Sequence, residues 1–142
     1  MLDFLLILHF IGLALGVGTG FAMLTLGLST ADMAPADRGA FMRRASVITR
    51  NGALGLTLLI LSGVGLVLVW GVREVMAVGG PMFHIKLTLV AIMIGVFGYL
   101  QVLLRQSRSP DGAAAEARIP VISRVMLVLG VSVVVFAVLA FH

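Results

Sequence analysis

Four long apolar runs constrain this chain more than any other feature of its sequence. They cover approximately residues 4–28, 45–72, 82–104 and 119–141. Each is as long as the roughly 20 predominantly apolar residues with which an α-helix crosses a bilayer. The chain is 61% hydrophobic and 11% charged, whereas an ordinary soluble domain has about 25% charged residues. The sequence therefore predicts an all-α integral membrane protein. Its 142 residues would form a single four-transmembrane-helix domain, an up-down-up-down bundle.

Basic residues alternate between the connections of these predicted spans. Those in or beside the first and third connections are Arg38, Arg43, Arg44, Arg50, Arg105, Arg108, Arg118 and Arg124. The middle connection has Arg73, with Lys86 just beyond it. Cytoplasmic loops of membrane proteins carry an excess of Lys and Arg. We therefore expect both termini on the outer side of a bacterial-type inner (cell) membrane. This topology accounts for the high pI of about 11.2, so we expect no nucleic-acid partner.

Small residues recur at helical spacing in the first and third runs. Gly12, Gly16 and Gly20 lie four residues apart, and His9 precedes the first of them by three. The second stripe follows His84 and consists of Thr88, Ala91, Gly95 and Gly98. Residues three or four apart share one face of a helix. Such stripes predict close helix–helix packing, or room for a flat ligand beside an imidazole, and the two are compatible.

Two histidines stand at the outer ends of these stripes. If the first and third spans both begin on the outer side, His9 and His84 differ in depth by only about 5 Å. Helices of a bundle can hold a cofactor between such side chains, and two neutral imidazoles suit the axial positions of haem b. The chain has fewer suitable ligands for zinc or copper, because it has no cysteine and no carboxylate deep in an apolar run. The alternatives are a hydrogen bond across helices for His9 and an interfacial position for His84. We expect no function for the terminal His142.

Two cations near the outer side are candidates to bind the propionates of a haem. Arg73 lies on that side of the predicted topology. Lys86 is offset by about 200° around its helix from His84, so the two cannot share a face. Lys86 either extends its ammonium to the interface or points at a neighbouring helix or an anionic group. Just before this span, Gly79-Gly80-Pro81 predicts a break, because proline suits the first turn of a helix.

A resemblance to a known family is carried by two segments, His84-Ile85-Lys86-Leu87-Thr88-Leu89-Val90-Ala91 and Leu8-His9-Phe10-Ile11-Gly12. The first resembles the third span of the HemJ family, and the second is similar to the start of its first span. HemJ proteins are small membrane protoporphyrinogen IX oxidases that bind haem b. The resemblance implies that His9 is a haem ligand and that His84, Lys86 and Arg44 match the family's polar pattern. Lys86 and Arg44 are therefore candidate catalytic residues. The candidates for cofactor binding are His9, His84, Arg73, Gly12 and Gly16.

The family also implies partners for the chain. Electrons would pass from a tetrapyrrole or another small redox substrate to a quinone or another membrane electron carrier. The chain departs from the family pattern at Met82-Phe83, Gly16 and Phe97, where family members usually have a tryptophan, another aromatic residue and a histidine. The alternative is a non-enzymatic, cytochrome-like subunit or assembly module of a larger complex. In that case the glycine stripes would serve as assembly faces. The sequence also leaves open whether the protein forms a homo-oligomer.

Overall fold

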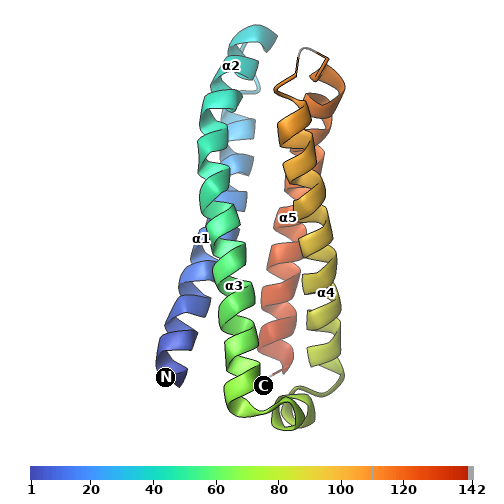
Figure 1. Ribbon diagram of the computed structural model, residues 1–142. Helices are drawn as coiled ribbons and strands as arrows, with labels where there is room; N and C mark the ends of the chain where they lie inside the picture. The colour runs from blue at the N-terminus through green and yellow to red at the C-terminus, as the bar shows by residue number, and fades with distance from the viewer. Residues whose placement is uncertain (110, 141–142) are drawn as a thin grey trace. The chain divides into compact units, whose positions relative to one another are not determined.

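The computed structural model describes residues 1–109 and 111–140, without the side chain of residue 140. Every regular element in this part of the chain is a helix (Figure 1). The elements are α1 (Leu2–Ser29), α2 (Pro35–Ala45), the 3-10 helix η1 (Ser46–Ile48), α3 (Thr49–Trp70), α4 (Val72–Gln106) and α5 (Ala113–Ala140). The end of the fourth predicted span at residue 141 and His142 lie outside the described residues.

Four helical stretches are long and apolar enough to cross a membrane. They are Leu2–Ser29, Pro35–Trp70, Val72–Gln106 and Ala113–Leu139. Many of their large apolar side chains are exposed, among them Phe10, Leu61 and Val128, as expected where lipid rather than protein covers a helix. The predicted fold class, an all-α membrane protein with four long apolar helices, is confirmed. The protein is a multi-pass membrane protein whose helices contact the bilayer.

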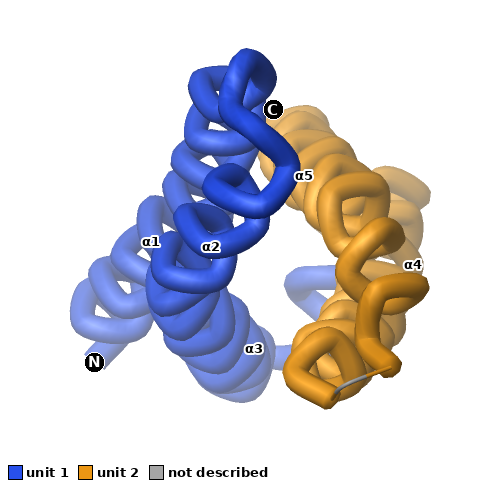
Figure 2. Tube along the Cα trace, turned by 90° about the horizontal axis from the view of Figure 1, so that it is seen from above, with its two compact units in different colours: residues 1–77 blue, residues 78–142 orange. Residues whose placement is uncertain are grey.

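The chain divides into two compact units, Met1–Ala77 and Val78–His142 (Figure 2). In the first unit α1 and α3 pack as an antiparallel pair. The contacts run in opposite directions along the two helices, since Leu5 lies against Gly65, Gly12 against Gly55 and Thr19 against Gly52. The glycines at these contacts let the two backbones come close, as small residues commonly do between membrane helices.

The second predicted span is the end of a longer helical stretch. α2 leads through the single 3-10 turn of η1 directly into α3. From Pro35 to Trp70 this stretch has 36 residues, or about 54 Å at 1.5 Å per residue, against a hydrocarbon core of about 30 Å. α2 carries most of the charge of this stretch, including Arg43 and Arg44, which are exposed. We infer that α2 projects beyond the hydrocarbon.

α4 contains a break where the sequence predicts one. Gly80 has φ 49° and ψ −146°, and Pro81 follows as the helix resumes. A residue before proline is disfavoured in the helical region, and glycine adopts a positive φ without steric cost. A Cβ at Gly80 would meet no atom within 4 Å, so the position requires glycine for its backbone conformation and not for space. The connection before the break, from Val72 to Gly79, is itself helical.

In the second unit the membrane part of α4 is followed by a short turn and α5. The hydroxyl of Tyr99 on α4 accepts a hydrogen bond from Arg118 Nη1 on α5, at 3.4 Å. The buried side chains of α4 recur at helical spacing and include Phe83, Met93, Leu100 and Leu103. This pattern defines the packed face of α4.

Candidate functional site

The best-defined polar contact between two membrane helices joins His9 of α1 to Ser62 of α3. His9 Nδ1 lies 2.9 Å from Ser62 Oγ. His9 is half-buried, and Ser62 is only 2% exposed. The hydroxyl of Ser62 also donates back along its own helix to the carbonyl oxygen of Leu58, at 2.5 Å. The three groups form a chain of hydrogen bonds from the imidazole into the backbone of α3.

Gly63 of α3 lies beside the imidazole of His9. A Cβ added to Gly63 would lie 3.5 Å from His9 Cε1 and 3.8 Å from Nδ1, which is ordinary van der Waals contact. One turn further along α1, Gly12 is buried, and a Cβ there would come within 2.8 Å of the Gly55 carbonyl oxygen. The ring therefore lies next to a backbone-to-backbone contact, which limits how α1 and α3 can move against each other.

Gly12 and Gly16 have different surroundings, although the sequence places them on one stripe. A Cβ at Gly12 would meet two backbone atoms and one side-chain atom at 3.0 Å or less. A Cβ at Gly16 would meet a single atom, Leu59 Cδ1, at 3.9 Å. The surroundings of Gly12 are those of close helix packing, one of the two interpretations that the sequence left open. A role for either glycine in binding a cofactor stays a prediction.

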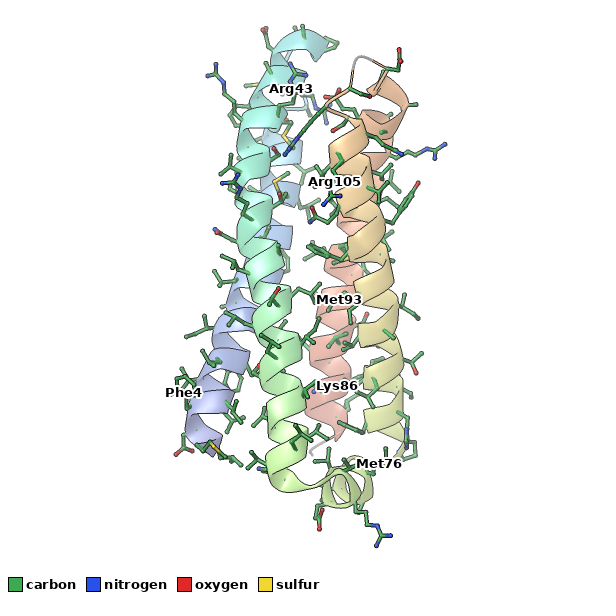
Figure 3. The ribbon with its side chains drawn as sticks, in the orientation of Figure 1. Phe4, Arg43, Met76, Lys86, Met93 and Arg105 are labelled. Atoms are coloured by element: carbon green, nitrogen blue, oxygen red, sulfur yellow. The ribbon has the colours of Figure 1, made fainter. Side chains whose placement is uncertain are left out.

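His84 and Lys86 lie on different faces of α4, as two residues about 200° apart must. His84 is exposed, and so are Thr88 and the other small residues of its stripe, Ala91, Gly95 and Gly98. A Cβ at Gly95 or Gly98 would meet no atom within 4 Å. Lys86, which is labelled in Figure 3, is half-buried and follows the buried Phe83 by three residues in the sequence. Its aliphatic stem thus belongs to the packed side of α4, and the stripe of His84 does not.

The two arginines proposed from the sequence are exposed, and one of them lies far from His9. Arg44 is on α2, beyond the start of α3, whereas His9 contacts Ser62 in the second half of α3. The 18 residues from Arg44 to Ser62 are helical almost throughout, a separation of about 27 Å along the axis. Arg73 lies in the first turn of α4, shortly after the end of α3 at Trp70. Within the first unit, Arg73 is therefore a cation at the His9 end of the α1–α3 pair.

His9 belongs to the first unit and His84 to the second, so their predicted pairing stays a hypothesis. Among the described residues no group of three or more His, Cys, Asp or Glu side chains could hold a metal ion. A mononuclear zinc site built from protein side chains needs at least three such ligands. A haem iron needs one or two, because the porphyrin supplies the other four. Haem ligation by His9 and His84 stays a prediction.

Ser62 is the residue of this site that the sequence did not reveal. A serine in a membrane helix commonly bonds to the carbonyl four residues earlier, and nothing local distinguishes Ser62 from Ser132, which does the same. The signal lies in the register of α1 against α3. Gly12 meets Gly55 and Leu5 meets Gly65, and His9 and Ser62 lie between these two contacts on their respective helices.

No family model, no curated protein and no solved structure matches this chain.

Proposed function

We propose that this protein is a haem b-binding redox protein of a bacterial-type inner membrane that resembles the HemJ type of protoporphyrinogen IX oxidase. His9 would be the principal axial ligand of the haem iron. The observation that carries the proposal is the hydrogen bond between His9 Nδ1 and the buried Ser62 hydroxyl. A histidine that ligates a metal almost always has its other ring nitrogen held in such a bond, which fixes the orientation of the ring.

The donors present in the chain fit this cofactor better than a bare metal ion. The chain has no cysteine, and His9 is an imidazole within an apolar helix. Histidine is a common axial ligand of haem iron in proteins.

The other candidate residues would have supporting roles. His84 is the candidate second ligand or close neighbour. Arg73 and Lys86 would neutralise propionates or an anionic tetrapyrrole substrate, and Arg44 is retained as a candidate through the resemblance alone. Bound haem would supply one-electron transfer between the substrate and a quinone or other membrane carrier. The protein would tune that transfer through the axial ligand and its burial.

The charge distribution supports the proposed orientation. The exposed arginines of α2 lie in the first connection, and Arg105, Arg108 and Arg118 lie in or beside the third. By the excess of positive charge in cytoplasmic loops, both connections would be cytoplasmic, with the N-terminus, His9 and Arg73 towards the outer side.

Optical spectra of the purified protein test the proposal. We expect a Soret band and reduced-minus-oxidised α and β bands of a b-type cytochrome in the wild-type protein. The His9→Ala variant should lose most of the haem, whereas the matched control His142→Ala should keep it. Wild-type protein expressed with ample haem synthesis yet lacking a Soret band would refute the proposal, as would full haem content in His9→Ala.

The alternative, a non-enzymatic subunit or assembly module, is favoured by one observation. The stripe of Thr88, Ala91, Gly95 and Gly98 on α4 is exposed, as a surface for another helix would be. The two functions differ in turnover. Oxidation of protoporphyrinogen IX that is lost in His9→Ala and reduced in Lys86→Met supports the enzyme. Haem binding without turnover, together with a partner that copurifies in fixed ratio, supports the module.

A further inference from the structure

We infer that Ser62 is a positioning residue that holds His9 in the tautomer protonated at Nδ1, which leaves the lone pair of the ring on Nε2. A neutral imidazole carries its proton on one of two nitrogens, and the hydrogen bond made at one nitrogen decides which. The inference rests on the geometry around the Ser62 hydroxyl, where three possible acceptors compete for one proton.

The hydroxyl of Ser62 has one hydrogen and two lone pairs. Its neighbours are the carbonyl oxygens of Leu58 at 2.5 Å and of Leu59 at 3.4 Å, and His9 Nδ1 at 2.9 Å. Carbonyl oxygens cannot donate. The Ser62 hydroxyl donates to the Leu58 carbonyl oxygen, four residues earlier on the same helix, so the serine proton lies there.

The proton between Ser62 and His9 must then come from the imidazole. His9 Nδ1–H donates, and the Ser62 oxygen accepts through a lone pair that the bond to Leu58 does not use. The opposite assignment would place the serine proton on the Nδ1 side and remove the hydrogen bond from the hydroxyl to the Leu58 carbonyl oxygen. Because Ser62 is 2% exposed, water cannot readily replace its hydroxyl.

The chemical consequence concerns Nε2. In the Nδ1–H tautomer, Nε2 can accept a proton or bind a metal without first losing a hydrogen. In the other tautomer, a hydrogen occupies that position. The tautomer itself does not depend on the proposed haem, whereas its benefit for haem ligation rests on the proposed function. Loss of such a supporting group typically lowers metal affinity by about 10–100-fold.

Nitrogen NMR of haem-free protein tests the tautomer directly. The chain has three histidines, so protein labelled with ¹⁵N-histidine gives few signals, and His9→Gln identifies those of His9. At alkaline pH, in detergent or nanodiscs, we expect Nδ1 of His9 to carry the proton in the wild type. Ser62→Ala should lose that preference, and Ser62→Thr, which keeps a hydroxyl, should restore it.

Ser132→Ala is the matched control, because Ser132 Oγ also donates to the carbonyl four residues earlier, at 2.8 Å from Val128. It should leave the His9 signals unchanged. A wild-type spectrum with the proton on Nε2 would overturn the inference, even if Ser62→Ala did not fold. A tautomer unchanged in a folded Ser62→Ala protein would also overturn it. Haem titration separates the two proposals, since wild-type protein with the expected tautomer but no haem binding would refute only the proposed function.

Discussion

Replacing Gly12 by alanine should loosen the α1–α3 pair more than the same substitution at Gly16 or Gly18. The new Cβ would lie 2.8 Å from the Gly55 oxygen, 2.9 Å from the Leu59 nitrogen and 3.0 Å from Leu58 Cβ. Ordinary contact begins near 3.4 Å, so the helices must separate locally by about 0.6 Å. Two of the three atoms belong to the backbone of α3, so a side-chain rotation cannot relieve the overlap.

The size of the effect follows from comparison with Gly18, where a Cβ would meet no atom within 4 Å. Both substitutions gain roughly 1 kcal/mol of helix propensity, so this term cancels in the difference. The remaining term is overpacking, which typically costs about 1–3 kcal/mol. Gly12→Ala should therefore be about 1–3 kcal/mol less stable than Gly18→Ala. Gly16→Ala, whose nearest contact is 3.9 Å away, should resemble Gly18→Ala.

Unfolding by SDS titration, followed by far-ultraviolet circular dichroism, measures this difference. The same variants report on the site, since His9 lies one turn from Gly12. A separation of about 0.6 Å would lengthen the 2.9 Å contact between His9 and Ser62 beyond the usual limit of about 3.2 Å. Gly12→Ala should thus also disturb the His9 tautomer. Equal midpoints for Gly12→Ala and Gly18→Ala would refute the packing described for this helix pair.

Three further predictions concern the second unit and the topology. Gly80→Ala places a side chain at φ 49° and should lower the free energy of unfolding by at least about 1–2 kcal/mol. Gly95→Ala, in an open helical position, should not destabilise the protein. SDS titration compares the two variants, and equal unfolding midpoints would contradict the conformational argument. If His84 is the second axial ligand, His84→Ala should convert low-spin haem to high-spin haem in the optical spectrum while haem remains bound; an unchanged spin state would exclude ligation by His84. Since the chain has no cysteine, a membrane-impermeant maleimide should label Arg73→Cys but not Ser109→Cys in intact cells, and the reverse pattern would invert the proposed orientation.

The fold could be predicted from the sequence where a single physical requirement dominates. The length of the apolar runs determined the four membrane helices, because a shorter helix does not cross a bilayer. The break before Pro81 was also predictable, since proline restricts the residue before it and Gly80 tolerates the positive φ. Both features depend on residues that are adjacent in sequence.

Helix boundaries outside the hydrocarbon were less predictable. The helical stretch begins at Pro35, about ten residues before the predicted start of the second span, and includes the charged residues of α2. Hydropathy detects the hydrocarbon-spanning part of a helix, and a polar helical extension in water leaves no such signal. The helical connection from Val72 to Gly79 escaped prediction for the same reason, because Arg73 and Glu74 interrupt the apolar pattern.

In the candidate site, too, the features that depend on one helix could be predicted, whereas those that depend on the packing of two helices could not. Each histidine was visible in its own helix, and the separation of His84 from Lys86 followed from the helical repeat alone. Ser62 became visible only when α1 and α3 were placed in register, because its function depends on the atom across the interface. Ser62 and Ser132 make the same bond within their own helices, and only Ser62 has His9 Nδ1 at 2.9 Å. The glycine contact that sets this register, Gly12 against Gly55, is therefore as much a determinant of the imidazole's chemistry as Ser62 itself.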